Sequence, residues 1–190
     1  ALVLIPVYFI GKALTGSPKV GLLPASIVAI LPSEFLQRSL LGFTDHHVLV
    51  VLLSTSTIAF LLLSNKQPNV LKYSILGGIS LGLYLLSWQG GIFLLLPIGV
   101  WVVLCREKMD RKNLTVLLGV GALLYTLTLL LLDYPPPMLR TTLFSIVGLI
   151  TLVWSMKWAD KRWKVGLVSS IGLVSLFFVY LQYPSLIYSL

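Results

Sequence analysis

Residues 47–63 read HVLVVLLSTSTIAFLLL. No Asp, Glu, Lys or Arg occurs within this stretch, and the next charged residue along the chain is Lys66. A helix that crosses the hydrocarbon core of a bilayer needs about 20 predominantly apolar residues. The stretch therefore predicts a membrane-spanning helix, and the apolar runs on both sides of it extend this prediction to the rest of the chain.

The composition of the whole chain agrees with this prediction. Of 190 residues, 57% are hydrophobic and 11% are charged, whereas a soluble domain has roughly 25% charged residues. A water-soluble globular domain is thereby excluded. About eight helices of about 19 residues each would use nearly all of the chain. We therefore expect residues 1–190 to form a single transmembrane domain, an all-α polytopic bundle of about eight spanning helices.

Charged or turn residues separate the apolar runs that we expect to be helices. These runs cover residues 1–10, 20–36, 47–63, 70–86, 91–104, 114–132, 141–156 and 165–183. The run 91–104 is short, and Pro97 interrupts it. The chain also begins at Ala1 without a methionine or a basic leader, which is typical of a fragment of a larger protein.

The formal net charge is +8, and most basic residues fall in alternate predicted loops. These residues are Lys12, Lys19, Lys66, Lys72, Arg106, Lys108, Arg111, Lys112, Lys157, Lys161, Arg162 and Lys164, which leaves only Arg38 and Arg140 on the other side. Positively charged loops stay in the cytoplasm, so the pattern predicts a multi-pass cell-membrane protein whose N-terminus lies outside. The basic residues do not form a cluster on a polar face, so they do not indicate nucleic-acid binding.

The outer loops then lie near residues 37–47, 87–91 and 133–140, and the first of them carries the most chemistry. Asp45 directly precedes an apolar helix, where an N-cap role would explain it. Alternatively, its carboxylate folds back toward His47 and gives an oxygen and nitrogen pair suited to Mn²⁺, Mg²⁺ or Zn²⁺. His46 would point elsewhere. Two ligands do not make a tight site, so further carboxylates would come from elsewhere in the protein.

Arg38 and Trp88 each have two explanations. Glu34 lies four residues before Arg38, which favours an ion pair on a helix, whereas a guanidinium near a metal also suits a phosphate or pyrophosphate group. Trp88 lies in the loop 87–91, which reads SWQGG. It is either an interfacial anchor in a turn or, beside two glycines that permit close approach, a stacking surface for a sugar or isoprenoid.

Two motifs resemble a known family. Residues 38–47, RSLLGFTDHH, resemble the Arg-Ser-x-x-Gly-x-x-Asp motif in the catalytic subunit of oligosaccharyltransferase, and the Asp-His-His form is similar to its archaeal branch. Residues 88–91, WQGG, are similar to the Trp-Gly-Gly type loop of the same family, and residues 4–8 and 11–12 resemble the helix that precedes the first motif. The resemblance covers essentially the whole chain but only the front membrane half of such an enzyme.

The resemblance implies a membrane glycosyltransferase of the GT-C class. Such an enzyme lies in membrane lipid and moves an oligosaccharide from a dolichol phosphate or pyrophosphate carrier to the asparagine of Asn-x-Ser/Thr in an acceptor polypeptide. It further implies that Asp45 binds the catalytic divalent cation, Mn²⁺ or Mg²⁺ with Zn²⁺ as an alternative, and that His47 joins it. Arg38 would meet the donor phosphate, and Trp88 the donor lipid. The first acidic motif, a glutamate-bearing loop and the acceptor-reading domain are absent, so we expect the isolated fragment to be inactive.

Three other readings of the chain stay open at this point. One is another GT-C transferase that uses a lipid-phosphate monosaccharide and a hydroxyl acceptor. A second is a polytopic transporter or channel with an ion site at Asp45 and His47, although transporters place ionisable groups near the middle of the bilayer and the predicted spans lack them. The third is a purely structural membrane subunit.

Residues 113–115 spell a glycosylation sequon, which we expect to be unmodified because it lies in a predicted inner loop.

Overall fold

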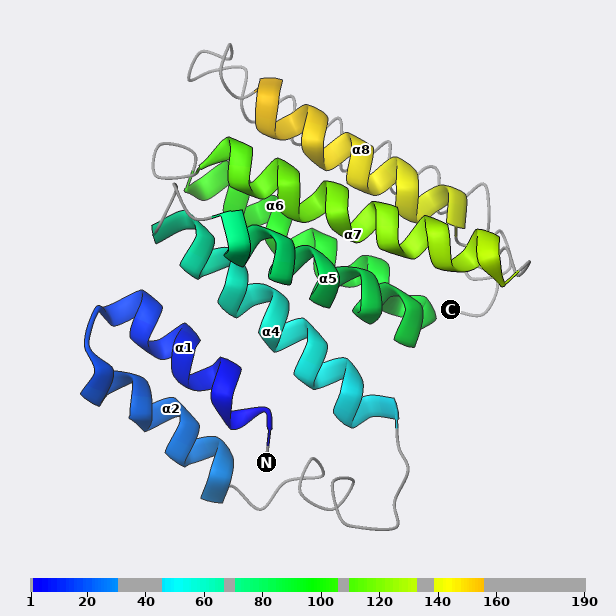
Figure 1. Ribbon diagram of the computed structural model, residues 1–190. Coiled ribbons are helices and arrows are strands. Elements are labelled where there is room, and N and C mark those ends of the chain that lie inside the picture. The colour runs from blue at the N-terminus through cyan, green and yellow to red at the C-terminus, as the bar shows by residue number, and fades with distance from the viewer. Residues whose placement is uncertain (1, 31–45, 67–70, 106–109, 133–138, 156–190) are drawn as a thin grey trace, which may run out of the picture. The chain divides into compact units, whose positions relative to one another are not determined.

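The structure is a computed structural model that describes residues 2–30, 46–66, 71–105, 110–132 and 139–155. These residues are all-helical and include no strand (Figure 1). The elements are α1 Leu4–Thr15, α2 Pro18–Ile30, α4 His46–Lys66, α5 Leu71–Ser87, the 3₁₀ helix η1 Gln89–Leu94, α6 Leu95–Leu104, α7 Arg111–Leu131 and α8 Leu139–Ser155. Each predicted apolar run except the last overlaps a helix, and the run 165–183 lies outside the described residues.

The contacts divide the chain into two units. The first comprises residues 1–91 and 110–133 and holds α1, α2, α4, α5 and α7; the second comprises residues 92–109 and 134–190 and holds α6 and α8. Within the first unit, α5 packs on both α4 and α7, and α1 packs on α2 and α4. Within the second unit, α6 packs on α8. A single transmembrane domain over residues 1–190 stays a prediction.

The first two helices form a tight hairpin. Gly16 ends α1 in the left-handed conformation at φ 75°, and its N–H donates to the carbonyl of Lys12. Pro18 then opens α2, where a missing N–H costs nothing. A Cβ atom on Gly11 would lie 3.0 Å from the Cα of Gly21, so the two backbones touch. α1 continues past Ile10 to Thr15, so Lys12 lies in the last turn of the helix and not in the expected loop. The connection to α2 is only this turn.

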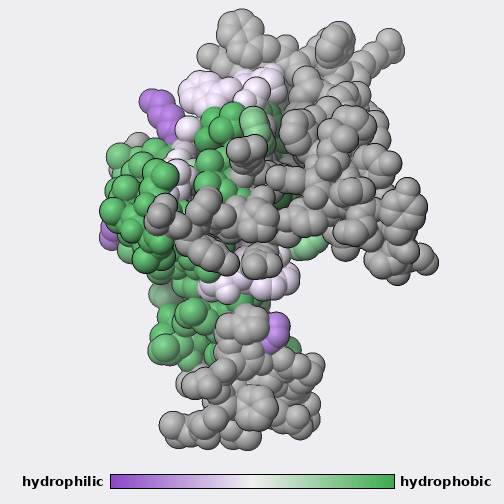
Figure 2. Space-filling model, turned by 90° about the vertical axis from the view of Figure 1, so that its right-hand side faces the viewer, coloured by the Kyte–Doolittle hydropathy of each residue, from purple (hydrophilic) through white to green (hydrophobic). Residues whose placement is uncertain are grey.

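On α5 most of the buried residues are small, and several large apolar side chains point outward. The small buried residues include Ser74, Gly77, Gly78 and Gly82. The exposed apolar residues are Leu71, Ile75, Leu76, Ile79 and Leu83. A Cβ on Gly78 would lie 2.7 Å from the carbonyl oxygen of Leu117 on α7, so only glycine permits this approach. Small residues between helices and large apolar residues outside are typical of helices packed in lipid. Figure 2 shows hydrophobic side chains over much of the described surface on one face.

Two described helices are long and apolar enough to cross a membrane, His47–Lys66 and Arg111–Leu131. The other apolar helices among the described residues have 10–17 residues. The run 91–104 is not one helix as predicted, because η1 precedes α6. Pro97 is the third residue of α6, and the first turn of a helix has no partners for its N–H groups, so the proline is tolerated there.

Candidate functional site

The first candidate site lies at the start of α4. This helix begins at His46, one residue before the predicted start, so position 45 immediately precedes the first helical residue, as an N-cap would. His47 lies in the first turn and is exposed. Asp45 and Arg38 lie outside the described residues, so the cap, the pairing of Arg38 with Glu34 and the pairing of Asp45 with His47 all stay predictions.

No group of three or more His, Cys, Asp or Glu side chains that could hold a metal ion occurs within the residues that the structure describes. His47 offers an imidazole in the exposed first turn of α4, a position compatible with a ligand role. One imidazole does not hold a divalent ion, since such sites use three or more protein ligands or several oxygens.

The second candidate site is the segment after α5. The indole of Trp88 packs edge-on against the ring of Tyr84, with ring centroids 6.5 Å apart and an interplanar angle of 73°. The N–H of Gly91 donates to the carbonyl of Trp88 at 2.9 Å, which closes the turn into η1. Trp88 is 37% exposed.

The two glycines after Trp88 accommodate the chain's own side chains. A Cβ on Gly90 would lie 2.5 Å from Cζ2 of Trp88, and one on Gly91 would lie 3.1 Å from Cα of Leu85. The space beside the two glycines is therefore already filled by atoms of Trp88 and Leu85. This geometry favours the turn explanation for the glycines and leaves the exposed part of the indole as the remaining candidate surface.

His47 and Trp88 lie at the same end of the first unit. α4 and α5 are neighbours in contact and run in opposite directions, so the start of α4 and the end of α5 share one end (Figure 1). Two of the four predicted site residues are thus brought to one end, and the other two lie outside the described residues.

The opposite end of the unit holds polar residues whose contacts with one another the sequence did not predict. We call Ser64, Asn65, Asp110 and Asn113 the α4–α7 clasp. Asn113 Nδ2 donates to the carbonyl of Ser64 at 2.9 Å, and the N–H of Asp110 donates to Oδ1 of Asn65 at 2.8 Å. Asp110 Oδ1 in turn accepts from the N–H of Asn113 at 3.1 Å and caps α7. An Asp before an apolar run is a cap signal, but no local signal indicates the partners on α4.

Asn113 is 1% exposed. Its amide is engaged with α4, so a glycosyltransferase has no access to it in the folded chain. This burial gives a physical reason for the expectation that the sequon at residues 113–115 is unmodified. The residue is instead part of the packing between α4 and α7.

Six basic residues lie at the same end as the clasp, and we call this surface the basic end (Figure 1). Lys12 and Lys66 are in the last turns of α1 and α4, and the others lie in the first turns of the helices that follow. The set comprises Lys12, Lys19, Lys66, Lys72, Arg111 and Lys112. Residues that were predicted to share one side of the membrane therefore share one end of the unit, opposite His47 and Trp88.

The family model described as "Oligosaccharyl transferase STT3, N-terminal" matches residues 1–189. The chain is 29% identical to dolichyl-phosphooligosaccharide-protein glycotransferase 3 of Archaeoglobus fulgidus, over 90% of the chain and 22% of that protein. It is 30% identical to dolichyl-monophosphooligosaccharide–protein glycotransferase AglB of Haloferax volcanii, over 97% of the chain and 21% of that protein. The chain thus spans about a fifth of the length of these curated relatives.

Two solved structures share the fold. One is an archaeal oligosaccharyltransferase AglB from Archaeoglobus fulgidus in complex with an inhibitory peptide and a dolichol-phosphate, with a TM-score of 0.71 and 24% identity over 95% of this chain and 25% of that one. The other is an Archaeoglobus fulgidus oligosaccharyltransferase in complex with Zn and sulfate, with a TM-score of 0.68 and 26% identity over 98% of this chain and 26% of that one. Because the family model matches nearly every residue, the chain belongs to the N-terminal STT3 family of oligosaccharyl transferases.

Proposed function

We propose that this chain is part of the membrane catalytic domain of an oligosaccharyltransferase. The enzyme moves a glycan from a dolichol-phosphate or dolichol-pyrophosphate carrier to the asparagine of Asn-x-Ser/Thr in an acceptor polypeptide. The observation that carries the proposal is the family match over residues 1–189, within which the motif at residues 38–47 leads directly into α4. The proposed carrier agrees with the dolichol-phosphate bound to one structural relative, which also holds an inhibitory peptide.

A divalent cation, Mn²⁺ or Mg²⁺ with Zn²⁺ as an alternative, would be held by Asp45 and His47. An amide nitrogen is a poor nucleophile, so the site has to position it against the anomeric carbon and stabilise the departing phosphate. When bound, the ion would supply charge stabilisation for that phosphate. The exposed first turn of α4 supports the role of His47, and a relative solved with Zn and sulfate supports a metal in the family. Further ligands would come from outside the described residues.

Arg38 would contact the donor phosphate, and Trp88 would contact the donor lipid or sugar. The support for Trp88 is its partly exposed indole, which the contact with Tyr84 holds at the same end of the unit as His47. A rigid aromatic surface at a membrane interface suits an amphiphile that has both a polar and an apolar part.

In this proposal the chain contributes about eight spans to a GT-C-like membrane bundle, with the catalytic loops on the extracytoplasmic face and the basic loops in the cytoplasm. The segregation of His47 and Trp88 from the basic end supports this topology, because positive charge accumulates on the cytoplasmic side.

The test is Asp45→Ala in the full-length protein that contains this chain. We expect membrane insertion to be retained and metal-dependent transfer from a dolichol-linked oligosaccharide to an Asn-x-Thr peptide to fall by at least about 100-fold, because the ion loses a carboxylate. His46→Ala is the matched control, since this neighbour is not expected to bind the ion, and it should transfer normally. Undiminished transfer by a folded Asp45→Ala protein would remove Asp45 from the catalytic site.

A further inference from the structure

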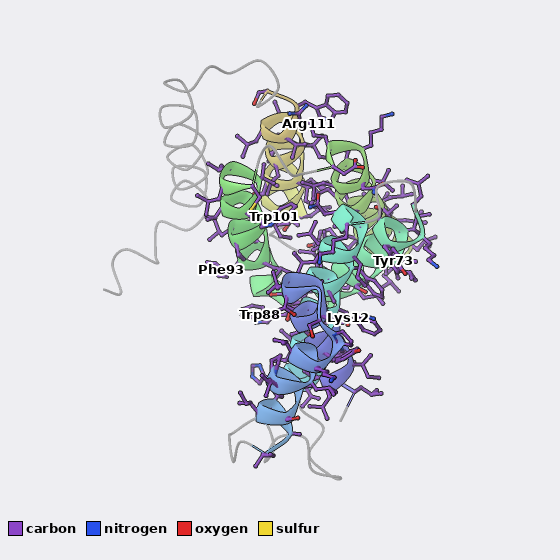
Figure 3. All side chains as sticks on the ribbon, turned by 90° about the vertical axis from the view of Figure 1, so that its left-hand side faces the viewer. Lys12, Tyr73, Trp88, Phe93, Trp101 and Arg111 are labelled. Atoms are coloured by element: carbon purple, nitrogen blue, oxygen red, sulfur yellow. The ribbon has the colours of Figure 1, made fainter. Side chains whose placement is uncertain are left out.

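We propose that the basic end of the first unit is a binding surface for the phosphate head groups of anionic phospholipids. Figure 3, which looks from the left-hand side of Figure 1, labels Lys12, Tyr73 and Arg111 on three different helices. The transfer reaction does not require such a surface, because the proposed site lies at the opposite end of the unit.

The charge of the basic end is not neutralised within the described residues. Asp110 is the single acidic residue among them, and its carboxylate accepts the N–H of Asn113 as the cap of α7. The four lysines at positions 12, 19, 66 and 72 are exposed, as is Lys112. An uncompensated positive surface attracts anionic lipids, and each basic residue near a membrane surface adds to this attraction.

The clasp brings three of the charges together. The N–H of Asp110 is bonded to the side chain of Asn65, so the next residues along each chain segment, Arg111 and Lys66, are held close to one another, with Lys112 following. Because this bond joins α4 to α7, the cluster does not depend on a flexible loop. Its preorganisation lowers the entropy cost of binding a head group.

Arg111 has a donor that needs an acceptor. Its Nε is buried, and it has no hydrogen-bond partner in the part of the chain that the structure describes. A buried donor without an acceptor is costly, and a phosphate offers oxygens that fit the guanidinium edge in a bidentate manner. The residue is the first of the 21-residue helix α7, where the N-terminal dipole also favours an anion.

The neighbouring surface is apolar, which favours a lipid over a soluble anion. On α5, Leu71 is 52% exposed beside Lys72, and Ile75 and Leu76 are exposed one turn further along. On α2, Val20, Leu22 and Leu23 are exposed next to Lys19. The Nζ of Lys72 lies 5.0 Å from the centroid of the Tyr73 ring, so an aromatic side chain sits at this boundary. A ligand with a phosphate and acyl chains covers both kinds of surface.

The experiment measures the association of spin-labelled phosphatidylglycerol and spin-labelled phosphatidylcholine with the full-length protein in bilayers. We expect the wild type to prefer phosphatidylglycerol at low ionic strength and to lose most of this preference in 1 M salt, which shortens the Debye length to about 3 Å. A wild type without any preference at low salt would overturn the proposal, and this arm needs no variant.

A charge-neutralised variant locates the surface. Combining K66Q, K72Q, R111Q and K112Q should lower the preference by at least about fivefold, the effect of losing one basic contact at a membrane surface. The matched control, K66R with K72R and K112R, keeps the charge and should keep the preference. R111K keeps the charge but removes the planar guanidinium, and it should weaken binding by less than the variant with four substitutions. A full preference in the neutralised variant, or an equal loss in the control, would contradict the proposal.

Competition separates a lipid from other anions. Glycerol 3-phosphate carries the same phosphate without acyl chains, and a single-stranded oligonucleotide carries many phosphates. Neither should displace spin-labelled phosphatidylglycerol at millimolar concentration, because neither covers the apolar surface beside Lys72. Displacement by glycerol 3-phosphate would show a site for free phosphate, and displacement by the oligonucleotide would show a general polyanion surface; either result would overturn the assignment to lipid.

Discussion

The two ends of the first unit use polar residues in different ways. At the basic end, Asn113 is buried and its amide bonds to the backbone of α4, while Asp110 caps α7 and bonds to Asn65. At the other end, His47 and Trp88 are exposed at helix termini. The side chains of the clasp thus join one helix to another, whereas His47 and Trp88 at the other end are exposed.

This difference shows how the position of a polar residue relates to its role. In a membrane protein an interfacial polar residue is a functional hypothesis by default. Here both ends carry such residues, and burial separates the residues that hold helices together from the exposed ones that are candidates for function. We therefore expect variants of the clasp to change stability with little change in transfer chemistry, and variants at the other end to do the reverse.

The largest effect on stability is expected for Asn113→Asp. The substitution keeps the size of the side chain but removes the donor to the carbonyl of Ser64 and places a carboxylate against that carbonyl oxygen. Leaving a buried charge without a partner costs about 3 kcal/mol or more. The measurement is the midpoint of thermal unfolding of the full-length protein in detergent, together with transfer activity per folded molecule.

Asn113→Ala provides the comparison for this variant. It removes the same hydrogen bond without burying a charge, and we expect a smaller loss of about 1–2 kcal/mol. Ser64 lies in the last turn of α4, where carbonyls have no partner further along the helix, so the variant takes the Asn113 donor from a carbonyl that its own helix does not satisfy. Transfer per folded molecule should match the wild type in both variants. Midpoints that are unchanged by Asn113→Asp would show that the clasp does not hold α4 to α7.

Sequence patterns predicted the helices far better than they predicted the clasp. The charge-free run at residues 47–63 and the Thr-Asp pair before it located the start of α4 to within one residue. Pro97 was interpreted as an interruption of a helix, whereas the structure places it in the first turn of α6. Apolar periodicity and caps are local properties of the chain, and both are readable from it.

The contacts between α4 and α7 are not local. The side chain of Asn65 bonds to a residue 45 positions later in the chain, and Asn113 bonds to one 49 positions earlier. A single sequence carries no pattern that pairs such positions, since each residue also suits a solvent-facing helix end. The candidate site was predicted from polar and aromatic residues in the expected outer loops and from a family motif, and of its four residues the structure describes His47 and Trp88.

A smaller effect is expected where α5 packs on α7 between the two ends. In Gly78→Ala the new Cβ would lie 2.6 Å from Cβ of Val120 and 2.7 Å from the carbonyl oxygen of Leu117. The neighbouring backbone has to shift, and overpacking of this kind costs about 1–3 kcal/mol. We expect a lower unfolding midpoint with normal transfer per folded molecule.

Gly119→Ala is the matched control, because nothing lies within 4 Å of a Cβ at that position on α7. Alanine is also the better helix former, so this variant should be neutral or slightly stabilising, by up to about 1 kcal/mol. Equal destabilisation by both variants would mean that the close approach of α5 to α7 is not what limits stability. Comparing Gly78→Ala with Gly119→Ala thereby measures the effect of close helix packing apart from the effect of hydrogen bonding at the basic end.

The smallest effect on stability, and the clearest effect on function, is expected for Gly90→Ala. The new Cβ would lie 2.5 Å from Cζ2 of Trp88, but that indole is partly exposed and can rotate away, so the unfolding free energy should change by less than about 1 kcal/mol. If Trp88 contacts the donor, its displacement raises the KM for the dolichol-linked oligosaccharide, and Trp88→Ala raises it in the same way. Steady-state kinetics and the unfolding midpoint measure both effects. An unchanged KM in both variants would remove Trp88 from the donor site, and a large loss of stability in Gly90→Ala would show that this end also holds helices together.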